Sequence, residues 1–98
     1  MDIKKVTNGT AVTLELAGRL DTITAPQLET ELKNTMDSME TLTLDFAKLD
    51  YISSAGLRVL LAAEKTLNKK GGMKLCHVST EIREVFDITG FSDILTIE

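Results

Sequence analysis

One join in the sequence constrains the fold more than any other stretch, because a strand pattern there runs directly into a helix pattern. Leu42, Leu44 and Phe46 alternate with polar residues, as in a strand with one buried face. Leucines then recur at helical spacing after residues 53–56, which are the four small residues Ser-Ser-Ala-Gly. The sequence therefore predicts an accessible strand-to-helix corner, whose free backbone N–H groups favour an oxygen-rich or negative group.

The chain before this join predicts a β-hairpin and then a helix. Asn8-Gly9 indicates a type I′ turn within a hairpin over residues 2–17, because both residues tolerate positive φ. A helix is expected to begin near Thr24 and to end near residue 37 or 38. Thr24 and Gln27 have the spacing of a capping box at its start.

The remaining elements follow from similar local signals. After a strand over Thr41–Phe46 and the corner, Gly71-Gly72 is expected to stop the second helix. The later elements are a strand, a third helix that begins at a Ser79 cap and closes at Gly90, and a short final strand, at residues 73–77, 80–89 and 94–97.

The order β-β-α-β-α-β-α-β predicts the α/β class and a small mixed β-sheet. Strands joined through helices should be parallel, with right-handed crossovers. The strands alternate rather than forming continuous apolar runs, so the helices should lie mainly on one face of the sheet. This architecture differs from a doubly wound sheet, and at 98 residues it is expected to be a single domain over residues 1–98.

Composition narrows the classes of partner and compartment. The formal net charge of −4 argues against nucleic acid or an anionic membrane as the main partner and favours a basic protein surface. The single cysteine, Cys76, excludes an intrachain disulfide. The N-terminus lacks the apolar region of a signal peptide, and no apolar run is long enough to span a membrane. A cytoplasmic location is the resulting expectation.

The residues of enzyme active sites are scarce in this sequence. Cys76 and His77 are adjacent, and neighbours in a strand point to opposite faces, so the pair should neither chelate a metal together nor form a nucleophile-base couple. Gly-x-Ser-x-Gly and phosphate-loop motifs do not occur. The sequence predicts a protein that is not an enzyme and that uses no cofactor or metal.

The small corner itself has two interpretations. In the structural one, Ser53 caps the helix, while Ala55 and Gly56 let that helix pack closely on the sheet. In the regulatory one, Ser54 is a modifiable hydroxyl in the first turn, with no bulky neighbour to block an approaching enzyme. The spacing of the residues is compatible with both.

Residues 49–61, Leu-Asp-Tyr-Ile-Ser-Ser-Ala-Gly-Leu-Arg-Val-Leu-Leu, resemble the signature of the STAS domain family, in particular of bacterial anti-sigma factor antagonists. Three further segments resemble the family in the same order along the chain, and together they span nearly its whole length. They are Gly18–Asp21 with Thr24-Ala25, Lys70–Leu75 and Val85–Phe91.

The resemblance implies a partner-switching regulator. In such proteins the serine that aligns with Ser54 accepts phosphate from a serine kinase that is also the anti-sigma factor. The unphosphorylated protein binds this kinase and frees the sigma factor; phosphorylation ends binding, and a serine phosphatase restores it. Ser53 stands where many members have Asp, so Ser53 is the alternative acceptor.

The partner-binding residues implied by the resemblance surround this corner: Asp21, Thr24, Ser53, Ser54, Gly56 and Arg58. Asp21 is also compatible with a turn or cap residue, and Arg58 with a solvated helix residue. Two other functions stay open. One is a STAS scaffold or adaptor subunit that is not phosphorylated, in a stress-signalling or lipid-transport complex. The other is a small module that binds an anion or nucleotide at the corner.

Overall fold

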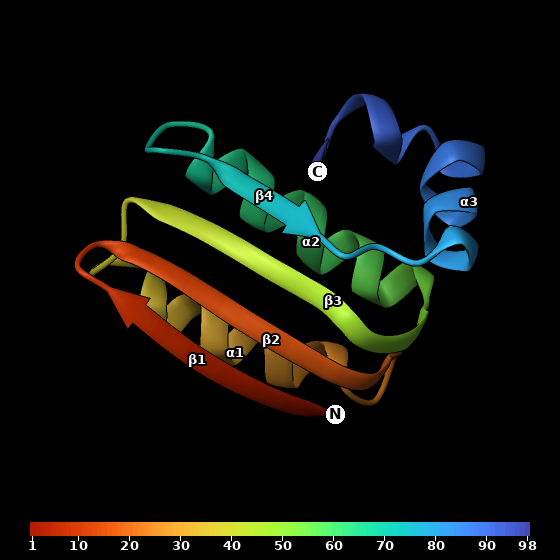
Figure 1. The fold of residues 1–98 in the computed structure, drawn as a ribbon, viewed down its shortest axis with the longest axis horizontal. Helices are drawn as coiled ribbons and strands as arrows, with labels where there is room; N and C mark the ends of the chain where they lie inside the picture. The colour runs from red at the N-terminus through yellow and green to blue at the C-terminus, as the bar shows by residue number, and fades with distance from the viewer.

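The strands of this protein form one five-stranded sheet in the order β1-β2-β3-β4-β5 (Figure 1). The computed structural model describes residues 1–98. Strands β1 and β2 pair antiparallel, and all later neighbours pair parallel. The elements are β1 Asp2–Asn8, β2 Ala11–Leu20, α1 Ala25–Met36, β3 Thr41–Ile52, α2 Ser54–Leu67, β4 Met73–Cys76, α3 Thr80–Thr89, the 3₁₀ helix η1 Phe91–Asp93 and β5 Thr96–Ile97.

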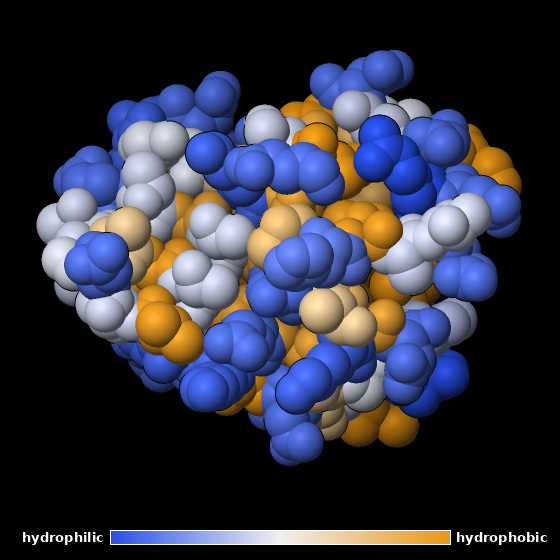
Figure 2. All heavy atoms as spheres, in the orientation of Figure 1, coloured by the Kyte–Doolittle hydropathy of each residue, from blue (hydrophilic) through white to orange (hydrophobic).

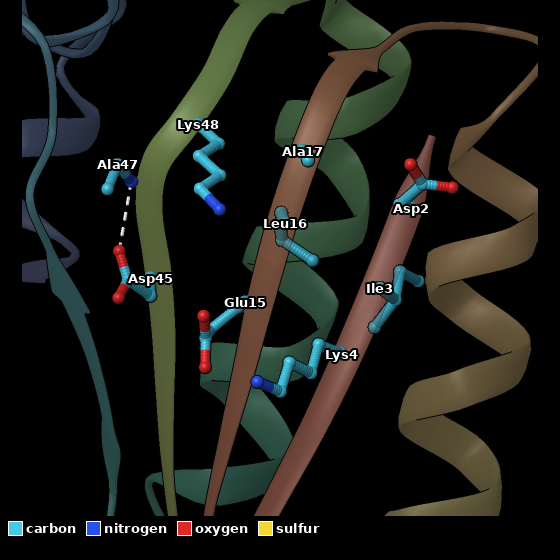
Figure 3. Close-up of a pocket in the computed structure, with 9 residues that line it drawn as sticks. All are labelled: Asp2, Ile3, Lys4, Glu15, Leu16, Ala17, Asp45, Ala47 and Lys48. Atoms are coloured by element: carbon cyan, nitrogen blue, oxygen red, sulfur yellow. Dashed lines mark hydrogen bonds between the residues drawn. The ribbon is translucent and has the colours of Figure 1, made fainter.

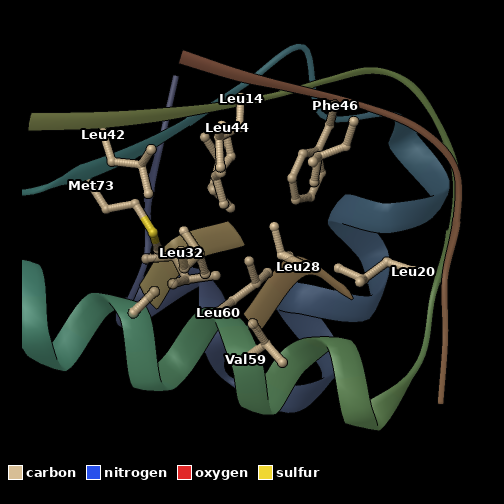
Figure 4. Packing of buried hydrophobic residues seen from close by; sticks show 14 of the residues in the cluster. Leu14, Leu20, Leu28, Leu32, Leu42, Leu44, Phe46, Val59, Leu60 and Met73 are labelled. Atoms are coloured by element: carbon tan, nitrogen blue, oxygen red, sulfur yellow. The ribbon is translucent and has the colours of Figure 1, made fainter. Parts of the chain in front are cut away.

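The helices cover one face of the sheet, which confirms the predicted one-sided α/β fold. In Figure 1, α1 and α2 pass behind the strands, which leaves the near face open. The apolar side chains of Leu44 and Phe46 point from β3 toward the helices (Figure 4). Phe46 also meets Phe86 of α3, with ring centroids 6.4 Å apart. The same view in spheres shows hydrophilic side chains spread over the open face, with smaller apolar areas between them (Figure 2).

Strands β2 and β3 are longer than the sequence predicts. The hairpin was expected to end near residue 17 and β3 near Phe46, but β2 reaches Leu20 and β3 reaches Ile52. Register shifts interrupt the β2–β3 ladder after Glu15 and again after Gly18. Each bulge changes which side chains face the core, so the strict alternation stops while the strands continue.

The hairpin turn lies one residue later than predicted. Asn8 is the last residue of β1 and pairs with Ala11, so the two loop residues are Gly9 and Thr10. Only Gly9 has positive φ, at 63°. That pattern belongs to a type II′ turn rather than type I′.

The capping box predicted for α1 is absent. Thr24 is the N-cap residue, but its side chain makes no cap hydrogen bond, and its backbone is already helical. Gln27 instead donates from Nε2 to the carbonyl oxygen of Met1 at 2.9 Å. The later caps are confirmed, because Ser79 Oγ accepts from the Ile82 N–H and Gly90 is left-handed at the end of α3.

Two strands near the C-terminus are shorter than expected. β4 ends at Cys76, because His77 adopts positive φ at 56° and leaves the strand. β5 contains only Thr96 and Ile97, since residues 91–93 form a 3₁₀ turn first. None of the helices has the length and apolar character needed to cross a lipid bilayer.

Candidate functional site

Ser53 joins β3 to α2 and acts as the helix cap. Its N–H donates to the Leu20 carbonyl at 2.9 Å, and its own carbonyl accepts from the Leu57 N–H at 3.0 Å. Its Oγ accepts from the Gly56 N–H at 3.4 Å, a long cap bond. The side chain is half-buried, so the structural interpretation of the corner holds for Ser53.

Ser54 is the first residue of α2 and has a different environment. It is exposed, and no hydrogen bond within the chain involves its hydroxyl. The first turn of α2 contains no acidic residue. Arg58, also exposed, follows one helical turn later. The hydroxyl thus lies free in solvent near unpaired backbone N–H groups and a cation.

Gly56 lies beneath the exposed start of α2 rather than on the surface of the domain. The residue is buried, and a Cβ built there would lie 2.7 Å from Leu20 Cγ and 2.9 Å from Ile52 Cγ1. A side chain at position 56 would therefore push α2 away from the ends of β2 and β3. Glycine lets the helix begin close against both strands and fixes the position of Ser54.

Asp21 and Thr24 form a turn between β2 and α1 that is held by hydrogen bonds. Asp21 Oδ1 accepts from the N–H groups of Ile23 and Thr24, each at 3.0 Å. The Thr24 hydroxyl donates to the Arg19 carbonyl at 2.7 Å and accepts from the Asp21 N–H at 2.9 Å. The Thr24 N–H is the main cause that holds the pKa of Asp21 below its ordinary value. Both residues therefore order the loop.

This turn presents an apolar side chain that the sequence did not single out. Ile23 is 87% exposed at the tip of the turn, while its own N–H is held by Asp21. A fixed, exposed isoleucine is a suitable contact for a partner protein. In the sequence, the signal that could have identified Ile23 was its position inside the Gly18–Thr24 segment.

Arg19 and Tyr51 join the ends of β2 and β3 beside the turn. The Arg19 guanidinium lies 4.1 Å from the centre of the Tyr51 ring, which is a cation–π distance. Arg19 Nε is also 3.7 Å from Asp21 Oδ2. Neither residue was predicted as part of the site.

The starts of α1 and α2 lie on either side of a hollow of about 230 Å³. The predicted residue Arg58 lines it together with Ala55, the neighbour of Ser54. The other lining residues come from the β2–α1 loop and from both helices: Thr22, Ala25, Pro26, Glu29 and Val59. The structure therefore brings the β2–α1 loop and the α2 corner into one surface at this end of the domain.

The prediction that Cys76 and His77 point to opposite faces of one strand is wrong. It assumed that both residues lie in β4, but the left-handed backbone of His77 turns its ring back toward β3. His77 Nδ1 lies 2.9 Å from Asp45 Oδ1. One donor atom from each of Asp45, Cys76 and His77 falls within 4.8 Å of the other two.

These features define a class of domain. It has a mixed sheet covered by helices on one face and an exposed serine at a strand-to-helix corner. The family model for the STAS domain matches residues 2–98. The chain belongs to the STAS domain family.

Curated relatives share much of this sequence. The chain is 32% identical over 98 residues to the anti-sigma-B factor antagonist of Bacillus subtilis, covering 99% of this chain and 88% of that protein. It is 44% identical over 84 residues to BtrV of Bordetella bronchiseptica, named as a candidate anti-sigma factor antagonist, covering 84% and 72%.

Solved structures share the fold. Unphosphorylated SpoIIAA, an anti-sigma factor antagonist, matches with a TM-score of 0.78 at 20% identity, covering 99% of this chain and 87% of that one. SpoIIAA from Bacillus in its phosphorylated form matches with 0.77 at 20% identity, covering 99% and 91%. An anti-sigma factor antagonist from Mycobacterium paratuberculosis matches with 0.88 at 23% identity, covering 98% and 83%.

Proposed function

We propose that this protein is an anti-sigma factor antagonist whose binding to an anti-sigma factor serine kinase is switched off by phosphorylation of Ser54. The observation that carries the proposal is the exposed, unbonded Ser54 hydroxyl at the start of α2. The names of the curated relatives support the regulatory class. In this proposal a serine phosphatase removes the phosphate and restores binding.

Ser54 is a better acceptor than its neighbour Ser53. The Ser53 hydroxyl is half-buried and accepts the cap hydrogen bond of α2 from Gly56. A kinase that used Ser53 would have to break this cap, at a cost of about 0.5–2 kcal/mol. Ser54 needs no such change.

The binding surface consists of this corner and the adjacent turn. Ser54 and Arg58 present polar groups, and Ile23 presents an apolar one. Asp21 and Thr24 hold the turn in place through their hydrogen bonds. Ser53 and Gly56 fix the start of the helix from beneath.

The charge of a phosphate acts differently within the chain and across an interface. A phosphoserine carries about −1.5 to −2 charges at pH 7. At a helix N-terminus it is stabilised by roughly 0.3–1 kcal/mol. A partner carboxylate about 4 Å away repels each unit charge by about 4 kcal/mol at an effective dielectric near 20. Since 1.4 kcal/mol is about tenfold in affinity, partial repulsion suffices for a hundredfold loss. The fold persists while the complex separates.

The acceptor is tested by mass spectrometry of the protein isolated from its own cells. Wild type, Ser53→Ala and Ser54→Ala are compared. The phosphorylated species is expected in wild type and Ser53→Ala and lost in Ser54→Ala. Loss in Ser53→Ala alone would transfer the switch to Ser53.

The partner is tested by a pull-down with wild type and Ser54→Glu as baits. A kinase-like protein should be retained by wild type and lost with Ser54→Glu. Thr80→Glu is the matched control, because Thr80 is the exposed first residue of α3 and carries the same added charge at another helix start. Equal retention by all three baits would instead indicate a scaffold that does not switch.

A further inference from the structure

The open face of the sheet carries a group of three different ligand side chains at the end of β4. Asp45 and Cys76 are register partners on the parallel strands β3 and β4. Both side chains are partly exposed, in contrast to their buried neighbours Leu44 and Leu75. Residues paired in register on one face of a sheet are neighbours, so the carboxylate and the thiol approach one another.

His77 completes the group because it leaves the strand. Its positive φ turns the imidazole to the side of Asp45, where Nδ1 lies 2.9 Å from Oδ1. The His77 side chain is 66% exposed and that of Asp45 is 21% exposed. The three donor atoms lie within 4.8 Å of one another and are open to solvent on one side.

From this geometry we infer that Asp45, Cys76 and His77 form a binding site for a divalent cation of zinc type. Thiolate, imidazole and carboxylate are the three side-chain ligands of Zn²⁺, whereas Mg²⁺ and Ca²⁺ prefer oxygen alone. Bond lengths of about 2.0–2.3 Å place tetrahedral donors roughly 3.3–3.8 Å apart. Side-chain movements of about an ångström bring the three donor atoms to that spacing and leave the fourth coordination position of the metal open to water.

The surroundings orient the ligands and supply negative charge. The Ala47 N–H donates to Asp45 Oδ1 at 2.9 Å, which holds the carboxylate over the open face (Figure 3). An outer hydrogen bond of this kind fixes metal-ligating groups. Burial opposes ionisation of Asp45, but Ala47 and His77 outweigh it and hold the pKa of Asp45 below its ordinary value. The carboxylate is therefore charged at neutral pH.

Cys76 must lose its proton when the metal binds. Burial raises the pKa of the Cys76 thiol, and the carboxylates of Asp45 and Glu98 add to this effect. The same two carboxylates that disfavour a bare thiolate favour a cation.

The test is calorimetric titration of the untagged, reduced, metal-free protein with Zn²⁺. One equivalent should bind per chain. Cys76→Ser and His77→Asn should each weaken binding by at least tenfold; asparagine is chosen because it tolerates positive φ. Glu15→Gln should bind as wild type does, because Glu15 lines a pocket on the open face together with Asp45 but lies outside the group of three ligands (Figure 3).

Cobalt provides a second readout that does not depend on affinity. Co²⁺ bound by the thiolate should produce a sulfur-to-metal charge-transfer band, present in wild type and Glu15→Gln and absent in Cys76→Ser. Binding without this band, or equal affinity of wild type and Cys76→Ser, would overturn the inference and leave Asp45 and His77 as a hydrogen-bonded pair. No outcome here depends on Ser54, so failure of this site and failure of the phosphorylation switch are distinguishable.

Discussion

Helices α2 and α3 begin in the same way and differ in what surrounds the beginning. Each has a serine cap, Ser53 or Ser79, whose hydroxyl accepts an N–H from the third helical residue. Each cap is followed by an exposed hydroxyl residue, Ser54 or Thr80. A serine cap with a free hydroxyl after it is therefore a common local structure, and it does not by itself identify a regulatory site.

The difference lies in charge and in packing. The first turn of α2 has no acid and continues to Arg58, whereas α3 has Glu81 in its first turn and Glu84 at the position that corresponds to Arg58. The third helical residue of α2 is Gly56, which lets the helix pack closely against the ends of β2 and β3. The third helical residue of α3 is Ile82, whose side chain is buried in the core. An added phosphate is thus favoured at the start of α2, whereas at the start of α3 the like charges of Glu81 and Glu84 offset the attraction of the helix N-terminus and of Arg83.

The largest contrast is expected between substitutions at the third helical residue. Ile82 is 2% exposed, so Ile82→Ala should lower the free energy of unfolding by about 2–5 kcal/mol through the cavity that it leaves. Gly56→Ala adds an atom where Leu20 and Ile52 already lie within 3 Å, and should cost about 1–3 kcal/mol by overpacking. Urea denaturation measures both. A neutral Gly56→Ala would show that α2 does not need its close approach.

This contrast also shows what the sequence could predict. The caps at Ser53 and Ser79 and the one-sided sheet followed from short-range patterns, since capping and alternation depend on neighbours in the chain. The use of Gly56 against Leu20 depends on where β2 ends, and bulges between β2 and β3 set that position. Bulges leave no periodic signal in one strand alone.

Prediction of the two candidate sites from the sequence was limited in the same way. The exposure of Ser54 could be predicted because its surroundings are its own neighbours along the chain. The group of Asp45, Cys76 and His77 could not, because it depends on the β3–β4 register and on one left-handed residue. The turn at Asp21 was anticipated as one of two possibilities, whereas its support by Thr24 and Arg19 required the fold.

Removal of the two caps should have a smaller effect. Ser79→Ala is expected to destabilise the domain by about 1 kcal/mol, within the range of 0.5–2 kcal/mol for such caps. Ser53→Ala should cost the same or less, because its cap bond is 3.4 Å long compared with 3.2 Å for Ser79. Thermal unfolding of both variants checks the order. A larger loss for Ser53→Ala would mean that Ser53 holds the corner by more than its cap.

Added charge tests the electrostatic difference directly. Ser54→Glu gains from the helix N-terminus and from Arg58 one turn later, while Thr80→Glu has Arg83 three residues later and Glu84 four residues later. Such pairs contribute about 0.2–0.5 kcal/mol, favourable for opposite charges and unfavourable for like charges. Ser54→Glu should therefore be more stable than Thr80→Glu, relative to wild type, by about 0.2–0.5 kcal/mol, because the two pairs of residue 80 largely cancel. High salt should reduce the difference, since both positions are exposed.

The smallest effect concerns the turn beside α2, for which α3 has no counterpart. The pKa of Asp21 is held below its ordinary value of 3.8, first by the Thr24 N–H and then by the Ile23 N–H, the Thr24 hydroxyl and Arg19. A carboxyl whose pKa is lowered on folding stabilises the fold above its unfolded value. That contribution disappears as pH falls through the lower folded value.

Carbon-detected NMR should therefore give an Asp21 titration midpoint below 3.8. Asp21→Asn keeps an oxygen acceptor for the turn but removes the titration, so its stability should fall less steeply in acid than that of wild type. Asp50→Asn is a suitable control, as an exposed aspartate on β3. A midpoint at or above 3.8 for Asp21 would mean that the turn is open in solution. Ile23 would then be presented to a partner by a mobile loop, and binding would have to order it first.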